Sequence, residues 1–64
     1  METNRERIVR RLLREGWVLV RHGGNHDIYK NERTGALVPI PRHRNLTPGL
    51  ARRIIRLNGW TEWL

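Results

Sequence analysis

Residues 17–30 read WVLVRHGGNHDIYK, two short β-prone runs joined by a polar turn. The first run, residues 17–22, is rich in β-branched and aromatic side chains, which favours a strand. Residues 23–25 hold two glycines and an asparagine, residue types that tolerate positive φ angles and sharp turns. Residues 26–30 form a second, more polar run. The pattern predicts an antiparallel hairpin in which His26 is the first residue after the turn.

A third strand is predicted directly after this hairpin. Residues 31–35, NERTG, have the composition of a turn and end in glycine. Residues 36–40, ALVPI, then form another short apolar run. Pro39 lacks a backbone donor for a ladder hydrogen bond, so we expect this strand to lie at an edge of the sheet.

A helix is predicted before the hairpin. Thr3 is expected to cap it, with Glu6 completing a capping box, and Gly16 to end it. Helical spacing gives it an apolar side and a basic side. The apolar side consists of Ile8, Val9, Leu12 and Leu13, and the basic side of Arg7, Arg10, Arg11 and Arg14.

A second helix is predicted after the three strands. Thr47 is placed to cap it, Pro48 suits its first position, and Asn58-Gly59 is a typical end. Its apolar arc comprises Leu50, Ala51, Ile54, Ile55 and Leu57, and its basic arc Arg52, Arg53 and Arg56. We expect Trp60 and Trp63 to fold back and enlarge the core.

The chain is therefore predicted to be a single α+β domain, residues 1–64, with the order αβββα. Each helix has one apolar face, so both should cover the same face of a three-stranded antiparallel sheet and leave the other face open. A chain of this size has a small core, and without cysteine it has neither a disulfide nor a thiolate metal site to support it. We expect a cytoplasmic protein, since no signal peptide or membrane-spanning run is present.

The charge of the chain indicates its partners. Thirteen Lys and Arg residues oppose six Asp and Glu residues, giving a formal net charge of +7, and Lys30 is the single lysine. Such an excess favours phosphate-rich partners or an acidic protein over a merely solvated surface. Guanidinium groups bind phosphate and carboxylate as two-pronged forks, which strengthens this interpretation.

His26 is the candidate for proton transfer, because imidazole titrates near neutral pH. The alternative is an exposed histidine with no chemical role. Arg21, Lys30, Arg42 and Arg44 are expected to lie nearest to it and to hold phosphates, and the amides of Gly23 and Gly24 to form an anion-binding nest.

The other histidines and Asp27 are weaker candidates for this chemistry. His43 is a weaker candidate for a second proton-transfer group, and His22 ends the other strand of the hairpin. Asp27 should point away from His26, because consecutive side chains of a strand alternate between faces. Three separated histidines and few carboxylates argue against a metal site, so neither a metal nor another cofactor is expected.

Two stretches of the chain resemble the HicA toxins, also called YcfA-like proteins. Gly16-Trp17 through Tyr29 resembles the part of that family in which a Gly-Ser-His motif opens the second strand and an aromatic residue follows. The second half is also similar to the family: Val38–Arg44 (VPIPRHR), Leu46–Gly49 (LTPG) and an Ala-, Arg- and Ile-rich helix ending at Asn58-Gly59.

The resemblance implies a fold similar to the double-stranded-RNA-binding domain and an RNA-cleaving toxin, an mRNA interferase of a type II toxin–antitoxin system. His26 would be the active histidine, and Gly24 and Asn25 of the motif would contact the RNA. Asn25 stands where the family usually has serine. A HicB antitoxin would bind the toxin and block it, covering His26.

The alternative function is a non-catalytic RNA-binding module that uses the same basic surface to bind A-form RNA by shape. Loss of His26 should abolish cleavage in the first case and leave RNA binding intact in both. DNA binding is a weaker alternative, because the two predicted helices lie at opposite ends of the chain and do not form a helix-turn-helix.

Overall fold

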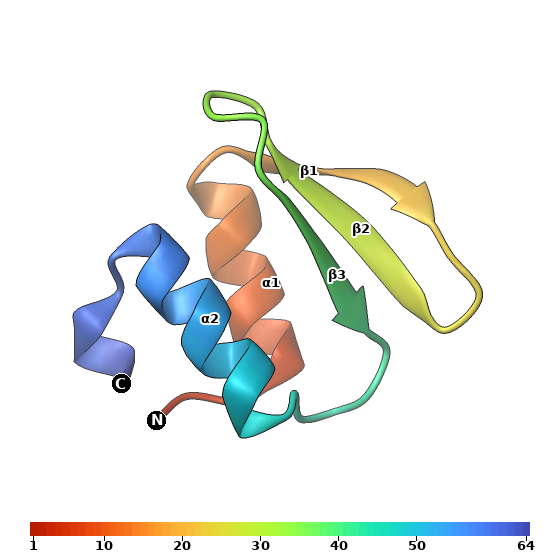
Figure 1. Ribbon diagram of the computed structural model, residues 1–64. Helices are drawn as coiled ribbons and strands as arrows, with labels where there is room; N and C mark the ends of the chain where they lie inside the picture. The colour runs from red at the N-terminus through yellow and green to blue at the C-terminus, as the bar shows by residue number, and fades with distance from the viewer.

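The computed structural model describes residues 1–64 and has the element order expected from the sequence (Figure 1). Its elements are α1 (Arg5–Arg14), β1 (Trp17–His22), β2 (His26–Asn31), β3 (Leu37–Pro41), α2 (Pro48–Asn58) and a short 3-10 helix, η1 (Thr61–Trp63). Neither α-helix has the length and apolar character needed to cross a bilayer.

The three strands form one antiparallel sheet in the order β1-β2-β3. β2 is central, and β3 lies at an edge, as Pro39 predicts. His26 pairs with Pro41, and Asp27 lies between His22 on one side and Ile40 on the other. The pairing of β1 with β2 shifts register between Leu19 and Arg21, which is the irregularity of a β-bulge.

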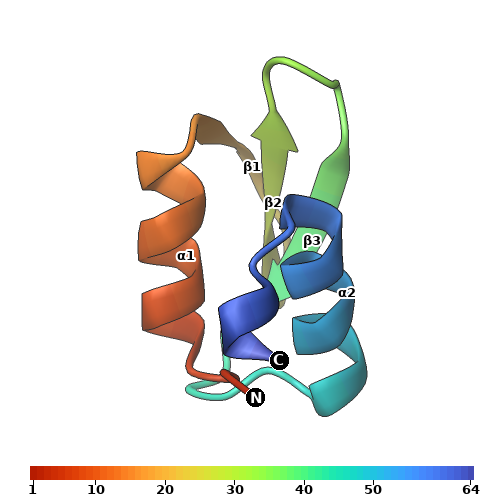
Figure 2. The same cartoon turned by 90° about the vertical axis from the view of Figure 1, so that its left-hand side faces the viewer.

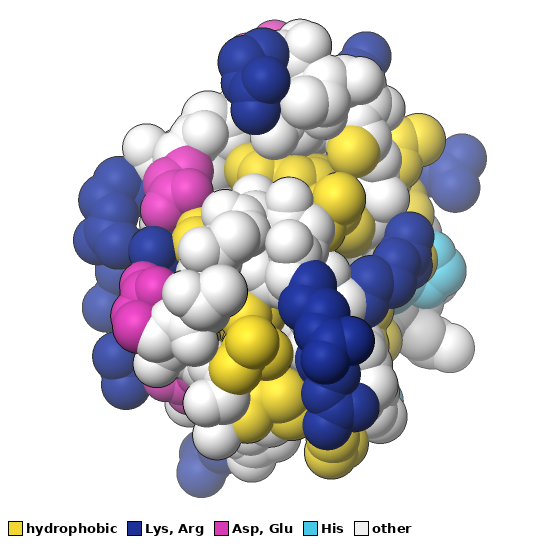
Figure 3. Space-filling view, turned by 60° about the vertical axis from the view of Figure 1, so that its left-hand side comes forward, with side chains coloured by type: hydrophobic (Ala, Val, Ile, Leu, Met, Phe, Trp, Pro, Cys, Tyr) yellow, Lys and Arg dark blue, Asp and Glu magenta, His cyan; other side chains and the backbone are white.

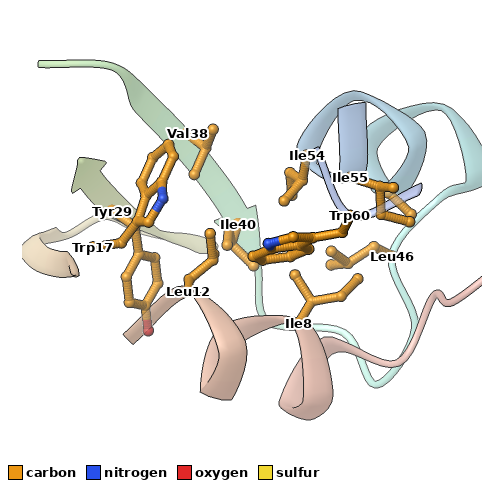
Figure 4. Packing of buried hydrophobic residues seen from close by; sticks show 11 residues of the cluster. Ile8, Leu12, Trp17, Tyr29, Val38, Ile40, Leu46, Ile54, Ile55 and Trp60 are labelled. Atoms are coloured by element: carbon orange, nitrogen blue, oxygen red, sulfur yellow. The ribbon is translucent and has the colours of Figure 1, made fainter. Parts of the chain in front are cut away.

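Both helices lie on the same side of the sheet and leave its other face open, so the molecule has two layers (Figures 1 and 2). The core between the layers is one cluster of eleven buried side chains, which Figure 4 shows as sticks. They are Ile8 and Leu12 from α1, Trp17, Tyr29, Val38 and Ile40 from the sheet, Leu46, Ala51, Ile54 and Ile55 from the connection and α2, and Trp60. The predicted α+β fold with αβββα order is confirmed.

Two details of the helices differ from the sequence-based expectation. Asn4, not Thr3, caps α1, because its side chain accepts a hydrogen bond from the Arg7 amide. Leu13 and Leu57 were expected on the apolar faces, yet each is about half exposed, at 51% and 50%. Each lies at the margin of its helix's apolar arc, and no third layer covers that margin.

The C-terminal tryptophans fold back onto α1, as predicted. Trp60 is buried, and its ring meets that of Trp63 edge-on, with 5.3 Å between the centroids. The Arg11 guanidinium stacks on both rings, and the indole N–H of Trp60 donates to Glu15. The C-terminal segment therefore packs against α1 and adds Trp60 to the core.

Candidate functional site

The side chains of β2 alternate between the two faces of the sheet. Asp27 and Tyr29 point toward the helices and are buried, whereas His26, Ile28 and Lys30 lie on the open face. His26 and Asp27 are adjacent in the chain but project to opposite sides. Asp27 therefore does not orient the His26 imidazole, in agreement with the sequence argument.

The turn before His26 is held by two backbone hydrogen bonds. The Gly23 amide donates to the His26 carbonyl at 2.7 Å, and the Arg42 amide donates to the Asn25 carbonyl at 3.2 Å. Because the Gly23 amide is already used, the anion-binding nest expected from the Gly23 and Gly24 amides does not form, and that prediction is wrong.

Glycine is required at position 23 because of close approach rather than a positive φ angle. No residue of the turn has positive φ. A Cβ atom at Gly23 would lie 2.9 Å from the His26 carbonyl oxygen and 3.2 Å from His26 Nε2. The imidazole of His26 therefore rests against the backbone of Gly23, with no space for a side chain between them.

Arg21 and Lys30 share the open face with His26. Arg21 pairs with Ile28 and so lies one diagonal step from His26, a separation that a long side chain can span. Lys30 lies four residues further along β2, roughly 13 Å from His26 at about 3.3 Å per residue. The face thus offers one cation close to His26 and a second one further along the same strand.

The same face carries an apolar depression that Arg21 borders. Its volume is about 380 Å³. It is lined by Val20, Arg21, Ile28, Leu37 and Pro39. This side of the sheet therefore combines a histidine, cations and uncovered apolar side chains.

On the helix side, Asp27 is the one buried charged residue of the chain. Its Oδ1 atom accepts hydrogen bonds from Arg42 Nη2 at 2.6 Å, His22 Nδ1 at 2.8 Å and Arg42 Nε at 3.1 Å. Its Oδ2 atom accepts from Arg5 Nη2 at 2.9 Å. The hydrogen bonds from Arg42 and then His22 hold the pKa of the Asp27 carboxyl well below its usual range, although desolvation opposes them.

The Arg42 side chain is used inside the protein. Besides its bonds to Asp27, it donates from Nη2 to the Gly23 carbonyl at 3.1 Å and from Nη1 to the Gly24 carbonyl at 3.3 Å. Asp27 in turn raises the pKa of Arg42. Of the residues expected to hold phosphates, Arg42 is therefore the one whose guanidinium already has a protein carboxylate and two carbonyls as partners.

Arg44 and His43 lie on the connection between β3 and α2, away from the open sheet face. With Arg42 they line one side of a groove of about 770 Å³, whose other side is α1. The structure thus brings Gly24, Asn25 and Arg42 to the turn that precedes His26 and places Arg21 on the same face as His26. Lys30 and Arg44 lie further along the surface.

Sequence reasoning missed the group formed by Arg5, His22, Asp27 and Arg42. Its members come from α1, β1, β2 and the segment after β3, so only the sheet register brings them together. One signal was present in the sequence: Asp27 is in phase with Tyr29, so a strand that buries the tyrosine also buries the carboxylate.

The unpaired positive charges are spread over the surface. Every carboxylate side chain except Glu32 has a cationic partner within 4 Å, and most of these partners belong to α1. Figure 3 shows acidic side chains interspersed with cationic ones on the α1 side of the molecule. Over α2 it shows cationic side chains with no acidic side chain beside them. The cations without a carboxylate partner are Arg14, Arg21, Lys30, Arg33, Arg44, Arg52, Arg53 and Arg56. No three His, Asp or Glu side chains gather in a way that could hold a metal ion.

One family of proteins matches most of the chain. Residues 5–60 match the family described as the HicA toxin of bacterial toxin–antitoxin systems. No curated protein matches the chain. Because the family match covers α1, all three strands, α2 and Trp60, the chain belongs to the HicA toxin family of bacterial toxin–antitoxin systems.

Proposed function

We propose that this toxin is an endoribonuclease, an mRNA interferase in which His26 transfers protons during cleavage of the RNA backbone. The observation that carries the proposal is the position of His26. It opens β2 on the uncovered face of the sheet, its ring lies against Gly23, and Arg21 is within side-chain reach. Asn25, which stands at the usual serine position of the family motif, precedes it in an exposed part of the turn.

RNA supplies its own nucleophile for this reaction. His26 removes the proton of a 2′-hydroxyl, and the 2′-oxygen forms a bond to the adjacent phosphorus. The bond from phosphorus to the 5′-oxygen breaks, and the leaving oxygen takes up a proton from solvent water. The products are a 2′,3′-cyclic phosphate and a 5′-hydroxyl. Arg21 is placed to stabilise the negative charge of the pentacoordinate phosphorane, and no step requires a metal ion.

The RNA backbone is expected to follow the unpaired cations. Gly24 and Asn25 form the exposed part of the turn, Arg21 and Lys30 extend the contact along the sheet, and Arg44 extends it toward the groove beside α1. Such contacts to phosphates supply affinity that does not depend on sequence.

The test is cleavage of a labelled mixed-sequence RNA in EDTA by the wild-type chain, His26→Ala and His43→Ala. His43 serves as the matched histidine, because it lies on the connection after β3 rather than on the sheet face. We expect 2′,3′-cyclic phosphate ends with the wild type and His43→Ala and none with His26→Ala. If all three proteins bind RNA and leave it intact, the chain is a non-catalytic RNA-binding module instead.

We further infer that a HicB-type antitoxin covers the open sheet face and with it His26. Leu37 and Val20 are about half exposed there, at 53% and 48%, beside the cations Arg21 and Lys30. A partner with an apolar centre and an acidic rim would complement this surface.

A matched pair of leucines tests this interface. Leu37→Glu changes the sheet face, whereas Leu57→Glu changes an equally exposed leucine on α2. Titration calorimetry with the antitoxin should show at least a tenfold weaker Kd for Leu37→Glu and little change for Leu57→Glu. Equal affinities for the two variants would place the antitoxin elsewhere on the toxin.

A further inference from the structure

Asp27 connects four parts of the chain at the end of the sheet where His26 lies. Its carboxylate accepts from Arg5 at the start of α1, from His22 at the end of β1 and from Arg42 after β3. The side chain of Asp27 itself is only 9% exposed. No RNA contact is therefore expected of Asp27.

Arg42 extends this connection to the turn that precedes His26. A guanidinium has five N–H donors, and four of those of Arg42 are engaged. Two of these donate to Asp27, one to the Gly23 carbonyl and one to the Gly24 carbonyl. A guanidinium used in this way has one N–H left for a phosphate.

The carbonyl groups that Arg42 holds belong to the surface on which the His26 imidazole rests. The ring lies against Gly23, and the Gly23 amide donates to the His26 carbonyl. The backbone amide of Arg42 also donates to the carbonyl of Asn25. Every residue of the turn before His26 therefore accepts a hydrogen bond from Arg42.

We propose that Arg42, anchored by Asp27, is a positioning residue that fixes the Gly23–Asn25 turn and so holds the imidazole of His26 in place for RNA cleavage. This inference deepens the ribonuclease function proposed above and rests on it. It assigns Arg42 to the rate of cleavage and not to phosphate binding. It also extends the site to Asp27, which faces the opposite side of the sheet from the RNA.

The charge state of Asp27 keeps this arrangement in place over the range in which cleavage is measured. Arg42 and His22 lower the pKa of Asp27, so the carboxyl stays ionised at neutral pH. Arg5 and His22 are the other charged or titratable groups that face the carboxylate, from α1 and β1.

Conservative variants of Arg42 and Asp27 separate positioning from phosphate binding. Arg42→Lys keeps the positive charge but lacks the planar fork that joins Asp27 to two carbonyls. Asp27→Asn keeps the shape of the side chain, removes a negative charge and leaves the exposed surface unchanged. Arg33→Lys, at the opposite hairpin turn where the arginine has no side-chain partner, is the matched control for an arginine-to-lysine change and should cleave at the wild-type rate.

The first readout is single-turnover cleavage of a trace of labelled RNA at saturating protein, with the RNA Kd measured at several salt concentrations. We expect Arg42→Lys and Asp27→Asn to cleave on the order of 10- to 100-fold more slowly, because small misplacements of a catalytic group have effects of this size. Their Kd and its salt dependence should stay near wild-type values. Wild-type rates, or a rate loss that follows a weaker Kd and a smaller salt slope, would overturn the proposal.

The second readout is backbone and imidazole NMR relaxation in the folded variants, which does not depend on activity. In Arg42→Lys the amides of Gly23–Asn25 and the His26 ring should lose order, while those of Trp17 and Tyr29 remain rigid. An equally rigid turn would refute the positioning role. A wild-type chain that fails to cleave RNA would refute the ribonuclease function, and the turn dynamics would still decide whether Arg42 fixes the turn.

Discussion

An alanine at position 23 would place a methyl group where His26 now lies. The new Cβ would lie 2.9 Å from the His26 carbonyl oxygen, whereas ordinary van der Waals contact begins at about 3.4 Å. The turn must therefore open by about 0.5 Å, or the imidazole, 3.2 Å away at Nε2, must swing aside. Because φ at Gly23 is not positive, the alanine adds no backbone strain of its own.

The expected effect of Gly23→Ala is a slower cleavage step with nearly unchanged RNA binding. A misplacement of about 1 Å costs on the order of 100-fold in rate, so a shift half as large should cost about tenfold. Single-turnover cleavage of a labelled RNA measures it. Gly49→Ala is the control, because a Cβ there meets nothing within 4 Å. Gly24→Ala also places its methyl group in open space, so a loss of activity there would report on RNA contact rather than crowding.

The free energy of unfolding is measured on the same proteins. If the turn does not open, the added methyl group strains the folded state and lowers its stability. Overpacking of this kind typically costs about 1–3 kcal/mol. Gly23→Ala should therefore lose activity, stability or both relative to Gly49→Ala. If Gly23→Ala matched Gly49→Ala in both measurements, the close approach of His26 to Gly23 would have no functional consequence.

Three further predictions concern the core, Asp27 and the sheet face. Trp60→Ala should lower the free energy of unfolding by about 3–5 kcal/mol, which is most of the stability expected for a domain of this size. A two-state thermal unfolding midpoint close to that of the wild type would contradict this prediction. Because the pKa of Asp27 is lower in the folded state, its contribution to stability is present above about pH 4 and lost as the pH falls further. The free energy of unfolding of Asp27→Asn should therefore be lower than that of the wild type at neutral pH and should fall less as the pH is lowered. If the two proteins lost stability in parallel with falling pH, this contribution of Asp27 would be excluded. Arg21→Ala should reduce the salt slope of RNA binding by about 0.7, and an unchanged slope would remove Arg21 from the contacts.

The element order could be predicted from the sequence because each boundary has a local cause. The turns around Gly23 and Gly35, the cap at Thr47 and the helix end at Gly59 all depend on neighbouring residues. The N-cap of α1 was missed because Thr3 and Asn4 both have suitable side chains, and the position of the first helical turn decides between them.

The apolar periodicity of the two helices predicted more buried side chains than the fold contains. Helical spacing places Leu13 and Leu57 next to buried neighbours, but a two-layer domain covers only the central part of each apolar arc. The surroundings of His26 were predictable only in part for a related reason. Local sequence placed the histidine after a turn, whereas Arg42 reaches that turn from a segment 15 residues beyond Asp27.

The distribution of contacts explains why charges hold this end of the sheet. None of the eleven core side chains comes from residues 21–26, so apolar packing does not fix the turn, and a short hairpin is only marginally stable by itself. Burying an ion pair seldom stabilises a protein more than apolar packing would. We therefore infer that the bonds among Arg5, His22, Asp27 and Arg42 are retained for the geometry that they impose. Core substitutions should then change mainly the fraction of folded toxin, whereas substitutions at Asp27 or Arg42 should also lower the rate at which the folded toxin cleaves RNA.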